Sequence, residues 1–273
     1  MDYFVEVDWL AEHLDDEDIA VVDTRSAPLS GIFPLLGREQ YFSGHIPGAI
    51  HLDYAVDLQD QETAYAALVA PPRRFADVLE NAGIGDRTTV VAYDGGEPPY
   101  AARLIWMLNY YGHDAAAILS GGIDAWIQAG LGRATEIPSR RPQRFTPEQR
   151  PRLRADREEV LDVAQGRSDA QLLSVSADLA YDMRNQEIPQ ARRLSCSQLF
   201  DERQGGKPAT LERLKELTAG LDSRKRTITY CGNGVSAAGA YVALRAAGFT
   251  DVAVYDGSWA DWSHHKLPTV VKS

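Results

Sequence analysis

The fold is decided by residues 226–267, RTITYCGNGVSAAGAYVALRAAGFTDVAVYDGSWADWSHHKL, because an earlier stretch follows the same plan. Residues 88–131 read TTVVAYDGGEPPYAARLIWMLNYYGHDAAAILSGGIDAWIQAGL. Each copy has an apolar run, a loop, a helical pattern that stops at a glycine, a second short apolar run and a segment that carries a tryptophan. Trp126 in the first copy matches Trp262 in the second. Such self-similarity indicates that the chain contains one structural unit twice.

The two copies predict alternating strands and helices. Short β-branched runs suit strands, and the amphipathic patterns between them suit helices. Gly112 and Gly248 would end the helices, because glycine adopts the left-handed conformation of a helix cap at little cost. The match continues upstream, where IAVVDTR (residues 19–25) pairs with QLLSVS (residues 171–176) and GHIPGA pairs with QEIPQA. Strands that alternate with helices pair in parallel.

We therefore expect an α/β protein made of two tandem domains, each a mainly parallel sheet flanked by helices. The first domain would span residues 1–134 and the second residues 155–273. Between them, residues 135–154 are rich in proline and arginine and predict an extended linker on the surface. The first copy has Asp94 where the second has Cys231, so only the second domain would carry thiol chemistry.

Composition narrows the range of functions. The 273 residues carry a formal net charge of -11, which disfavours binding to nucleic acids and to anionic membranes. The N-terminal stretch lacks a basic region followed by an apolar core, and no apolar run is long enough to span a membrane. The chain has two cysteines and no CxxC spacing. This pattern favours a reducing compartment, which we expect to be cytoplasmic, and does not support a structural metal site.

Cys231 lies between a predicted strand and a predicted helix, in the loop CGNGVS. A loop in this position turns successive backbone N–H groups inward, and the helix adds the positive end of its dipole. Gly232 and Gly234 would permit the dihedral angles that such a ring requires and would leave no side chains in the way. The ring would stabilise a thiolate at Cys231 and then a second sulfur attached to it, so a persulfide intermediate fits the loop.

A different interpretation is a small buried cysteine in a glycine-rich turn, because free cysteine is among the most frequently buried residues. Spacing alone does not separate the two interpretations. Cys196, the other cysteine, would either protect Cys231 as a resolving thiol or pack beside a strand. The first copy sharpens the choice, since Asp94 cannot form a persulfide and Pro98 and Pro99 remove N–H groups from its loop.

At these residues the chain resembles the two-domain rhodanese family of sulfurtransferases. The resemblance rests on the repeat, on GHIPGA in the first half, and on the cysteine-led loop and DGSWADW (residues 256–262) in the second. It implies an inactive first domain with Asp94 and an active second domain with Cys231. The loop CGNGVS is more similar to the 3-mercaptopyruvate type, CGSGVT, than to the thiosulfate type, CRKGVT. Gly232 therefore stands where the thiosulfate type has a cation.

The resemblance also implies the remaining site residues. Arg184 would bind the substrate carboxylate in a bidentate manner, with a surface arginine as the alternative. His45 of GHIPGA matches a family histidine and would act either beside the substrate or as a hydrogen-bonded turn residue. The expected active-site loop after the cysteine consists of Gly232, Asn233, Gly234, Val235 and Ser236.

The sequence departs from the family at three places. Asn233 replaces a serine that the family assigns to a Ser-His-Asp relay. Ser174 and Ser176 stand where an Asp-x-Arg pattern follows the first strand, and QEIPQA replaces GHIPGA in the second half. These changes indicate an altered substrate range or weak activity.

The sequence thus predicts a sulfurtransferase. Cys231 would take sulfur from a small anionic donor, 3-mercaptopyruvate rather than thiosulfate, and pass it to thioredoxin, a low-molecular-weight thiol or cyanide, without a metal or organic cofactor. A phosphatase is a weaker alternative, because its loop would end in a phosphate-clamping arginine where Ser236 and Ala237 stand. A binding or regulatory module is a third interpretation, favoured by Ser174 and Ser176 and disfavoured by the retained Cys231.

Overall fold

The computed structural model describes residues 2–26, 36–96, 99–176, 185–201 and 206–271, which fall into two compact units. Unit 1 comprises Met1–Gln61, Val69–Gln149 and Asp201–Lys207, and unit 2 comprises Glu62–Leu68, Arg150–Phe200 and Pro208–Ser273. Each unit contains one copy of the repeat together with a short segment from the other half of the chain.

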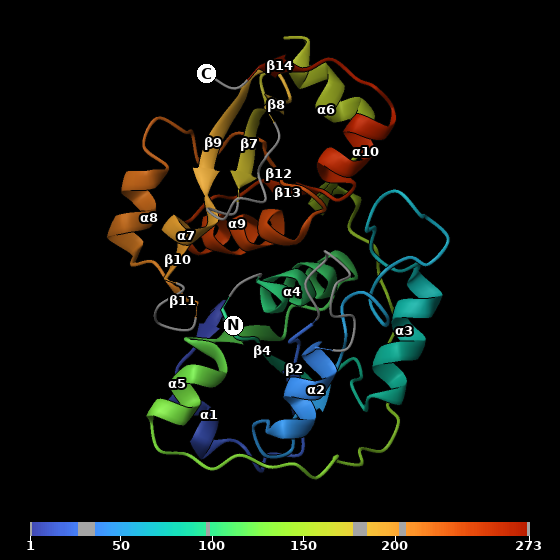
Figure 1. Ribbon diagram of the computed structural model, residues 1–273, viewed down its shortest axis with the longest axis vertical. Helices are drawn as coiled ribbons and strands as arrows, with labels where there is room; N and C mark the ends of the chain where they lie inside the picture. Colours follow the sequence, from blue (N-terminus) through green and yellow to red (C-terminus); the bar gives the residue numbers. More distant parts are fainter. Residues whose placement is uncertain (1, 27–35, 97–98, 177–184, 202–205, 272–273) are drawn as a thin grey trace. The chain divides into compact units, whose positions relative to one another are not determined.

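Unit 1 is built on a five-stranded sheet in which every pairing is parallel (Figure 1). The strand order is β1-β5-β4-β2-β3. The strands are β1 (Phe4–Val5), β2 (Ile19–Asp23), β3 (Ile50–His51), β4 (Thr89–Tyr93) and β5 (Ala116–Leu119). The inner strands β2 and β4 are buried almost throughout, as expected for a parallel sheet with helices on both faces.

Unit 2 repeats this sheet with the strand order β6-β13-β12-β7-β9, again with parallel pairing throughout. The strands are β6 (Arg154–Ala155), β7 (Gln171–Ser176), β9 (Ala191–Ser195), β12 (Thr227–Tyr230) and β13 (Val252–Tyr255). Two small two-stranded sheets pair β10 (Phe200–Asp201) with β11 (Lys207–Pro208) and β8 (Gln186–Glu187) with β14 (Val270–Val271). The order in unit 2 matches that in unit 1 position by position, which confirms the predicted fold of two parallel sheets.

Helices flank both sheets, and Gly112 and Gly248 follow α4 and α9 in the left-handed conformation that the sequence predicted, with φ of +89° and +92°. The helices of unit 1 are α1 (Val7–Glu12), α2 (Leu36–Ser43), α3 (Pro72–Asn81), α4 (Tyr100–Tyr110) and α5 (Gly122–Gln128). Those of unit 2 are η1 (Pro151–Leu153), α6 (Arg157–Ala164), α7 (Cys196–Leu199), α8 (Leu211–Leu217), α9 (Val235–Ala246) and α10 (Ser258–His264).

The side chains of β12 alternate between two layers of unit 2. The Thr229 hydroxyl donates to the carbonyl of Ala237 in α9. Ile228 and Tyr230 instead pack in a core cluster that contains residues of α6 and Trp262 of α10. Successive side chains of a strand point to opposite faces, so α9 covers one face of the sheet and α6 and α10 cover the other.

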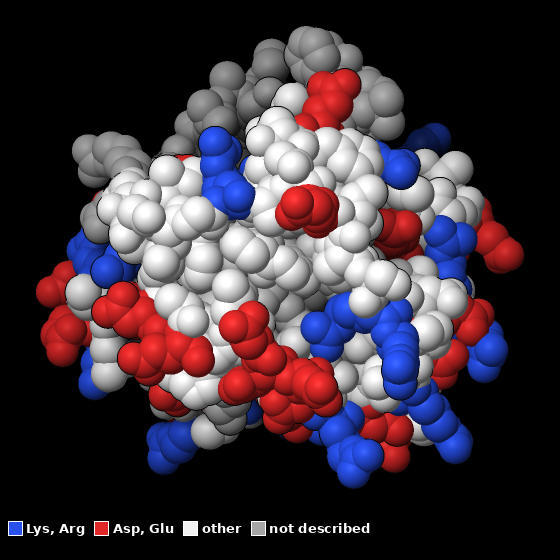
Figure 2. Space-filling model, turned by 90° about the horizontal axis from the view of Figure 1, so that it is seen from below, with Lys and Arg blue, Asp and Glu red and all other residues white. Residues whose placement is uncertain are grey.

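The predicted linker, residues 135–154, has no helix or strand over residues 135–150, and its last residues form η1 and the first residue of β6. Within the part of the chain that the structure describes, no helix has both the length and the apolar character needed to cross a membrane. Figure 2 shows one face with a broad uncharged area, which is bordered by groups of acidic and of basic side chains. That face therefore presents no continuous basic surface of the kind that binds nucleic acid.

Candidate active site

Cys231 lies at the carboxyl end of β12, the central strand of the unit 2 sheet. Ligands of open α/β sheets bind along this edge, where loops lead from strands into helices. Gly234 caps α9 with a φ of +89°. Its N–H donates a hydrogen bond to Cys231 Sγ at 3.0 Å, and the cysteine is 3% exposed. The sulfur therefore meets a backbone donor of its own loop.

The two loop glycines have different roles. Gly234 needs the left-handed conformation, whereas Gly232 does not adopt it. The prediction that both glycines supply unusual dihedral angles is therefore wrong for Gly232. A side chain at position 232 would extend into open space. What Gly232 provides is the absence of bulk and charge beside the thiol.

The other predicted loop residues form the approach to α9. Val235 opens the helix and is 2% exposed, while Asn233 and Ser236 are half-buried. The N–H groups of a first helical turn have no acceptor within the helix. Val235 and Ser236 lie in this first turn, directly after the cysteine loop.

Asp94 occupies the equivalent place in unit 1, at the end of β4. Its carboxylate accepts hydrogen bonds from the N–H groups of Gly96 and Ala101, both at 2.8 Å. Burial raises the pKa of Asp94 from 3.8 to about 6, although these two hydrogen bonds act in the opposite direction. The side chain thus occupies the amide donors of its own loop. Pro98, expected to remove one such donor, lies outside the described residues.

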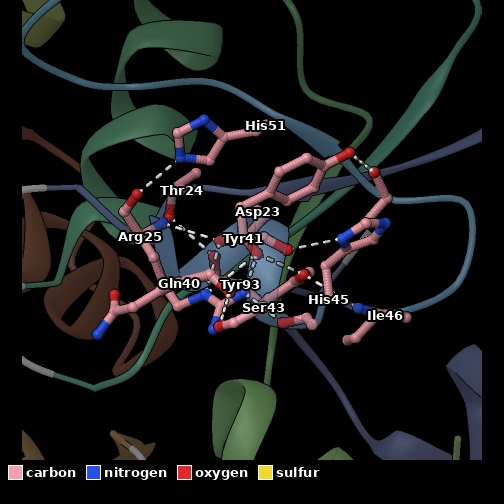
Figure 3. A network of polar contacts seen from close by, with 12 residues as sticks. Asp23, Thr24, Arg25, Gln40, Tyr41, Ser43, His45, Ile46, His51 and Tyr93 are labelled. Atoms are coloured by element: carbon pink, nitrogen blue, oxygen red, sulfur yellow. Dashed lines mark hydrogen bonds and ion pairs between the residues drawn. The ribbon is translucent and has the colours of Figure 1, made fainter. Parts of the chain in front are cut away.

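Figure 3 shows His45 in a buried polar network of unit 1. The ring stacks on Tyr41 with centroids 4.0 Å apart, and the residue is fully buried. Nδ1 lies 2.9 Å from the carbonyl oxygen of Tyr41, and Nε2 lies 3.1 Å from that of Glu136. Each ring nitrogen thus lies within hydrogen-bonding distance of a backbone carbonyl, as in a hydrogen-bonded turn histidine, and a neutral ring donates from one of them. A substrate contact would have to displace one of these carbonyls.

The same network holds the Asp-x-Arg pattern of the first copy (Figure 3). Asp23 is fully buried and accepts hydrogen bonds from Arg25 Nε at 3.0 Å and from the Tyr93 hydroxyl at 2.7 Å. Burial, reinforced by the Asp23 charge, raises the pKa of Tyr93, which keeps this hydroxyl a donor. Tyr93 also accepts a hydrogen bond from the N–H of Ile46, at 3.2 Å, which ties the IPGA turn to the sheet.

Unit 2 keeps the tyrosine of this network without the ion pair. Ser174 lies opposite Tyr230 in the sheet register, as Asp23 lies opposite Tyr93. The Tyr230 hydroxyl still accepts the N–H of Ile188, at 3.1 Å. The turn is therefore attached to the sheet in the same way, but a serine replaces the buried charge near the carboxyl edge.

Arg184, the arginine expected to bind the substrate carboxylate, is followed after IPQA by two more arginines, Arg192 and Arg193. Arg184 lies outside the described residues. Arg192 donates to the carbonyl of Ala219 at 2.7 Å, and Arg193 forms an ion pair with Glu187 at 2.8 Å. The latter two arginines thus hold parts of unit 2 together, and the role of Arg184 stays a prediction.

Cys196 is fully buried at the start of α7, directly after β9. In the sheet order, β7 separates β9 from β12, which precedes Cys231. Two strand spacings amount to about 10 Å, whereas the Cα atoms of a disulfide lie within about 7 Å. Cys196 therefore does not resolve Cys231 as a disulfide partner in this fold, and it packs as a core residue.

Sequence reasoning missed one contribution: the first turn of α10 holds the backbone of the cysteine loop. The N–H of Trp259 donates to the carbonyl of Cys231, and the N–H of Ala260 donates to that of Gly232, both at 3.0 Å. Unit 1 has a related contact, in which the N–H of Ile123 donates to the carbonyl of Asp94 at 3.1 Å. The signal was the position of DGSWADW in the repeat, which here serves as more than a core anchor.

Comparison with known proteins agrees with this architecture. A family model named "Rhodanese-like domain" matches residues 6–129 and 157–265. The 3-mercaptopyruvate sulfurtransferase of Escherichia coli (strain K12) is 30% identical over 95% of this chain and 94% of its own length. The thiosulfate sulfurtransferase of Bos taurus is 29% identical over 85% of this chain and 81% of its own length.

A solved structure gives the same result. The crystal structure of SseA from Escherichia coli, a 3-mercaptopyruvate sulfotransferase, has a TM-score of 0.84 at 28% identity and covers 95% of this chain and 99% of its own. The chain belongs to the rhodanese family. Sulfur transfer is the class of reaction that its named relatives share.

Proposed function

We propose that this sulfurtransferase moves one sulfur atom from a small anionic donor to a thiol or cyanide through a persulfide on Cys231. The observation that carries the proposal is the hydrogen bond from the Gly234 N–H to Cys231 Sγ, at 3.0 Å, at the carboxyl edge of the sheet. A backbone donor aimed at sulfur stabilises a thiolate and needs no reorganisation when charge develops. Asp94 cannot serve this purpose in unit 1.

The first half-reaction transfers sulfur to the enzyme. Cys231 thiolate attacks the donor sulfur and forms an S–S bond. With 3-mercaptopyruvate, the C–S bond breaks, the electron pair stays on carbon, and that carbon takes the proton of the donor thiol to give pyruvate. With thiosulfate, the S–S bond of the donor breaks and sulfite leaves.

The second half-reaction regenerates the enzyme. An acceptor thiolate, such as that of thioredoxin or a low-molecular-weight thiol, or cyanide attacks the outer sulfur of the persulfide. The Cys231 thiolate is the leaving group, so the overall cycle is neutral in electrons and needs no metal or organic cofactor. Two half-reactions through a covalent intermediate give ping-pong kinetics.

The donor is proposed to be 3-mercaptopyruvate, because position 232 carries no cation. Thiosulfate is a dianion, and a loop that relies on amides alone favours a monoanionic keto acid whose carboxylate binds elsewhere. We assign that carboxylate to Arg184. The similarity to the E. coli 3-mercaptopyruvate enzyme supports this choice, but the bovine thiosulfate enzyme is almost as similar. The preference therefore rests on the chemistry of Gly232.

The test compares both donors in the wild-type protein and in C231S. We expect wild-type turnover to be faster with 3-mercaptopyruvate than with thiosulfate, and C231S to be inactive with both. Intact-protein mass spectrometry should show a gain of about 32 Da after donor alone, located on the peptide with Cys231. The variant C196S is the matched control and should keep both activity and mass gain. Faster turnover with thiosulfate would overturn the donor assignment.

A catalytically weak binding or regulatory module is the second candidate. It is favoured by Ser174 and Ser176, which replace the Asp-x-Arg pattern in the unit that carries the cysteine. A wild-type protein that folds but gains no mass with either donor would establish this alternative. The cytoplasmic location and the identity of the acceptor stay predictions.

A further inference from the structure

Ser258 has a backbone conformation that serine rarely adopts. Its φ is +51°, in the left-handed region, and the residue is fully buried. The matching residue of the first copy is Gly122, with a φ of +55°. A side chain in this region clashes with the backbone and costs about 1 kcal/mol or more. Unit 2 therefore keeps a strained serine at a position where unit 1 has the residue that fits without strain.

The hydroxyl of Ser258 has two defined partners. It donates to the carbonyl of Tyr255, at 2.9 Å, and it accepts the backbone N–H of Cys231, at 3.2 Å. A hydroxyl has a single proton to donate. Because that proton points at Tyr255, the lone pairs of the oxygen are left to face the N–H of Cys231.

Together with its neighbour, Ser258 fixes the backbone of the cysteine on both sides of Cα. The peptide N–H of Cys231 is held by the Ser258 hydroxyl, and the carbonyl of Cys231 is held by the N–H of Trp259. The direction of the Cα–Cβ bond follows from these two peptide planes. In unit 1 only the carbonyl contact has a counterpart, from Ile123 to Asp94, since Gly122 has no hydroxyl.

We propose that Ser258 is a positioning residue for sulfur transfer. Its hydroxyl orients the Cys231 backbone so that Sγ meets the Gly234 N–H, and this gain outweighs the backbone strain that Gly122 avoids. The inference rests on the proposed function of Cys231, and it assigns Ser258 no contact with the substrate. It explains why strain is found in the unit with the thiol and is absent at the matching place in the unit with the carboxylate.

Three variants separate positioning from stability. S258A removes the hydroxyl and keeps the strained backbone, whereas S258G removes both. K266G is the matched control, because Lys266 has the same φ of +51° just after α10 and has no part in holding Cys231. S258G should melt at a higher temperature than S258A, and K266G should melt at or above the temperature of the wild type.

The rate of sulfur transfer should depend on whether the Ser258 hydroxyl is present. We expect S258A and S258G to form the Cys231 persulfide and to transfer sulfur about three- to tenfold more slowly than the wild type, the effect of one lost hydrogen bond. K266G should match the wild type. Alkylation of Cys231 by iodoacetamide, followed by peptide mass spectrometry across a pH series, should shift to higher pH in both Ser258 variants and stay unchanged in K266G.

Two results would overturn the inference. One is wild-type sulfur transfer and an unshifted alkylation profile in S258G. The other is a loss of activity in S258A alone, which would show that activity follows stability. A wild-type protein without any persulfide would refute the proposed function instead, and the alkylation profiles would still decide whether Ser258 positions Cys231.

Discussion

Asp94 and Cys231 end the central strands of the two sheets, and each side chain is met by a backbone N–H of the segment that follows. For Asp94, burial of the charged carboxylate costs free energy. Its carboxylate gains two hydrogen bonds and loses its hydration, and the raised pKa shows that the loss is the larger effect. Unit 1 therefore contains a buried carboxyl group that carries a charge only above about pH 6.

This carboxyl group should make the stability of unit 1 depend on pH. Because the folded-state pKa is raised, the contribution to stability is complete below the unfolded-state pKa near 4 and is lost as the pH rises through about 6. In D94N this loss is absent. Relative to the wild type, the unfolding free energy of D94N should therefore rise by about 2–3 kcal/mol between pH 4 and pH 7, as measured by urea denaturation. A difference that stays constant with pH would contradict the prediction.

Single residues differ in how far the sequence predicts their roles. The match of Asp94 with Cys231 follows from the order of residues in the repeat and needs no geometry. The contact of His45 with Glu136 depends on two distant segments meeting, which no local pattern reports. The role of Ser258 is harder still to predict from the sequence, because serine rarely adopts a left-handed backbone conformation. Its only signal is the alignment with Gly122.

The turns after the IP dipeptides show the same contrast at the level of elements. Gly48 in the first turn has a φ of +74°, and Gln190 takes the equivalent place in the second with a φ of +65°. Gln190 is exposed, and a side chain at Gly48 would meet no neighbour within 4 Å. Space therefore does not require a glycine at this place in either turn. The backbone of Gln190 is strained only because a residue with a side chain adopts a positive φ.

Replacing Gln190 by glycine should relieve this strain. We expect Q190G to raise the free energy of unfolding by about 0.5–1 kcal/mol, because the relief of the left-handed backbone exceeds the greater chain entropy of glycine when unfolded. The reverse change in the other copy, G48Q, should lower it by a similar amount. Thermal melts of both variants check the prediction, and a Q190G variant that is less stable than the wild type would refute it.

Most elements were predictable because they are long enough to show a period. The strands IAVV and TITY and the helices that follow each loop are of this kind. The two-residue edge strands β1 and β6 were not predicted, since a run of two residues has no alternation to detect. They form through pairing with β5 and β13, which is a tertiary effect.

At the scale of the whole molecule, each unit has a hydrophobic core of its own. Trp126 belongs to a cluster with residues of β2 and β4, and Trp262 belongs to a cluster with residues of β7, β12 and β13. The indole N–H of Trp126 donates to the carbonyl of Gly132 at 2.8 Å, and that of Trp262 donates to the carbonyl of Pro268 at 3.0 Å. The duplication thus extends from the order of strands to the anchoring of single side chains.

Trp262→Ala should destabilise unit 2 by about 3–5 kcal/mol, because the indole is fully buried and its hydrogen bond is lost. Hydrogen exchange followed by mass spectrometry should show the largest loss of protection in β12 and β13. Trp126→Ala is the matched control and should show its largest loss in β4 and β5. Equal loss in both sheets after either change would contradict the separation of the two cores.

The left-handed positions of the chain have one more consequence. Among the residues that the structure describes, the first copy has glycine at three places where the second has a larger residue with a similar φ; the pairs are Gly48 and Gln190, Gly122 and Ser258, and Gly130 and Lys266. Each of these three strained residues in unit 2 therefore has a matching glycine, free of the same strain, in unit 1 of the same protein. Exchanging the members of a pair measures the free-energy cost of a side chain in the left-handed conformation at that site, with the rest of the protein unchanged.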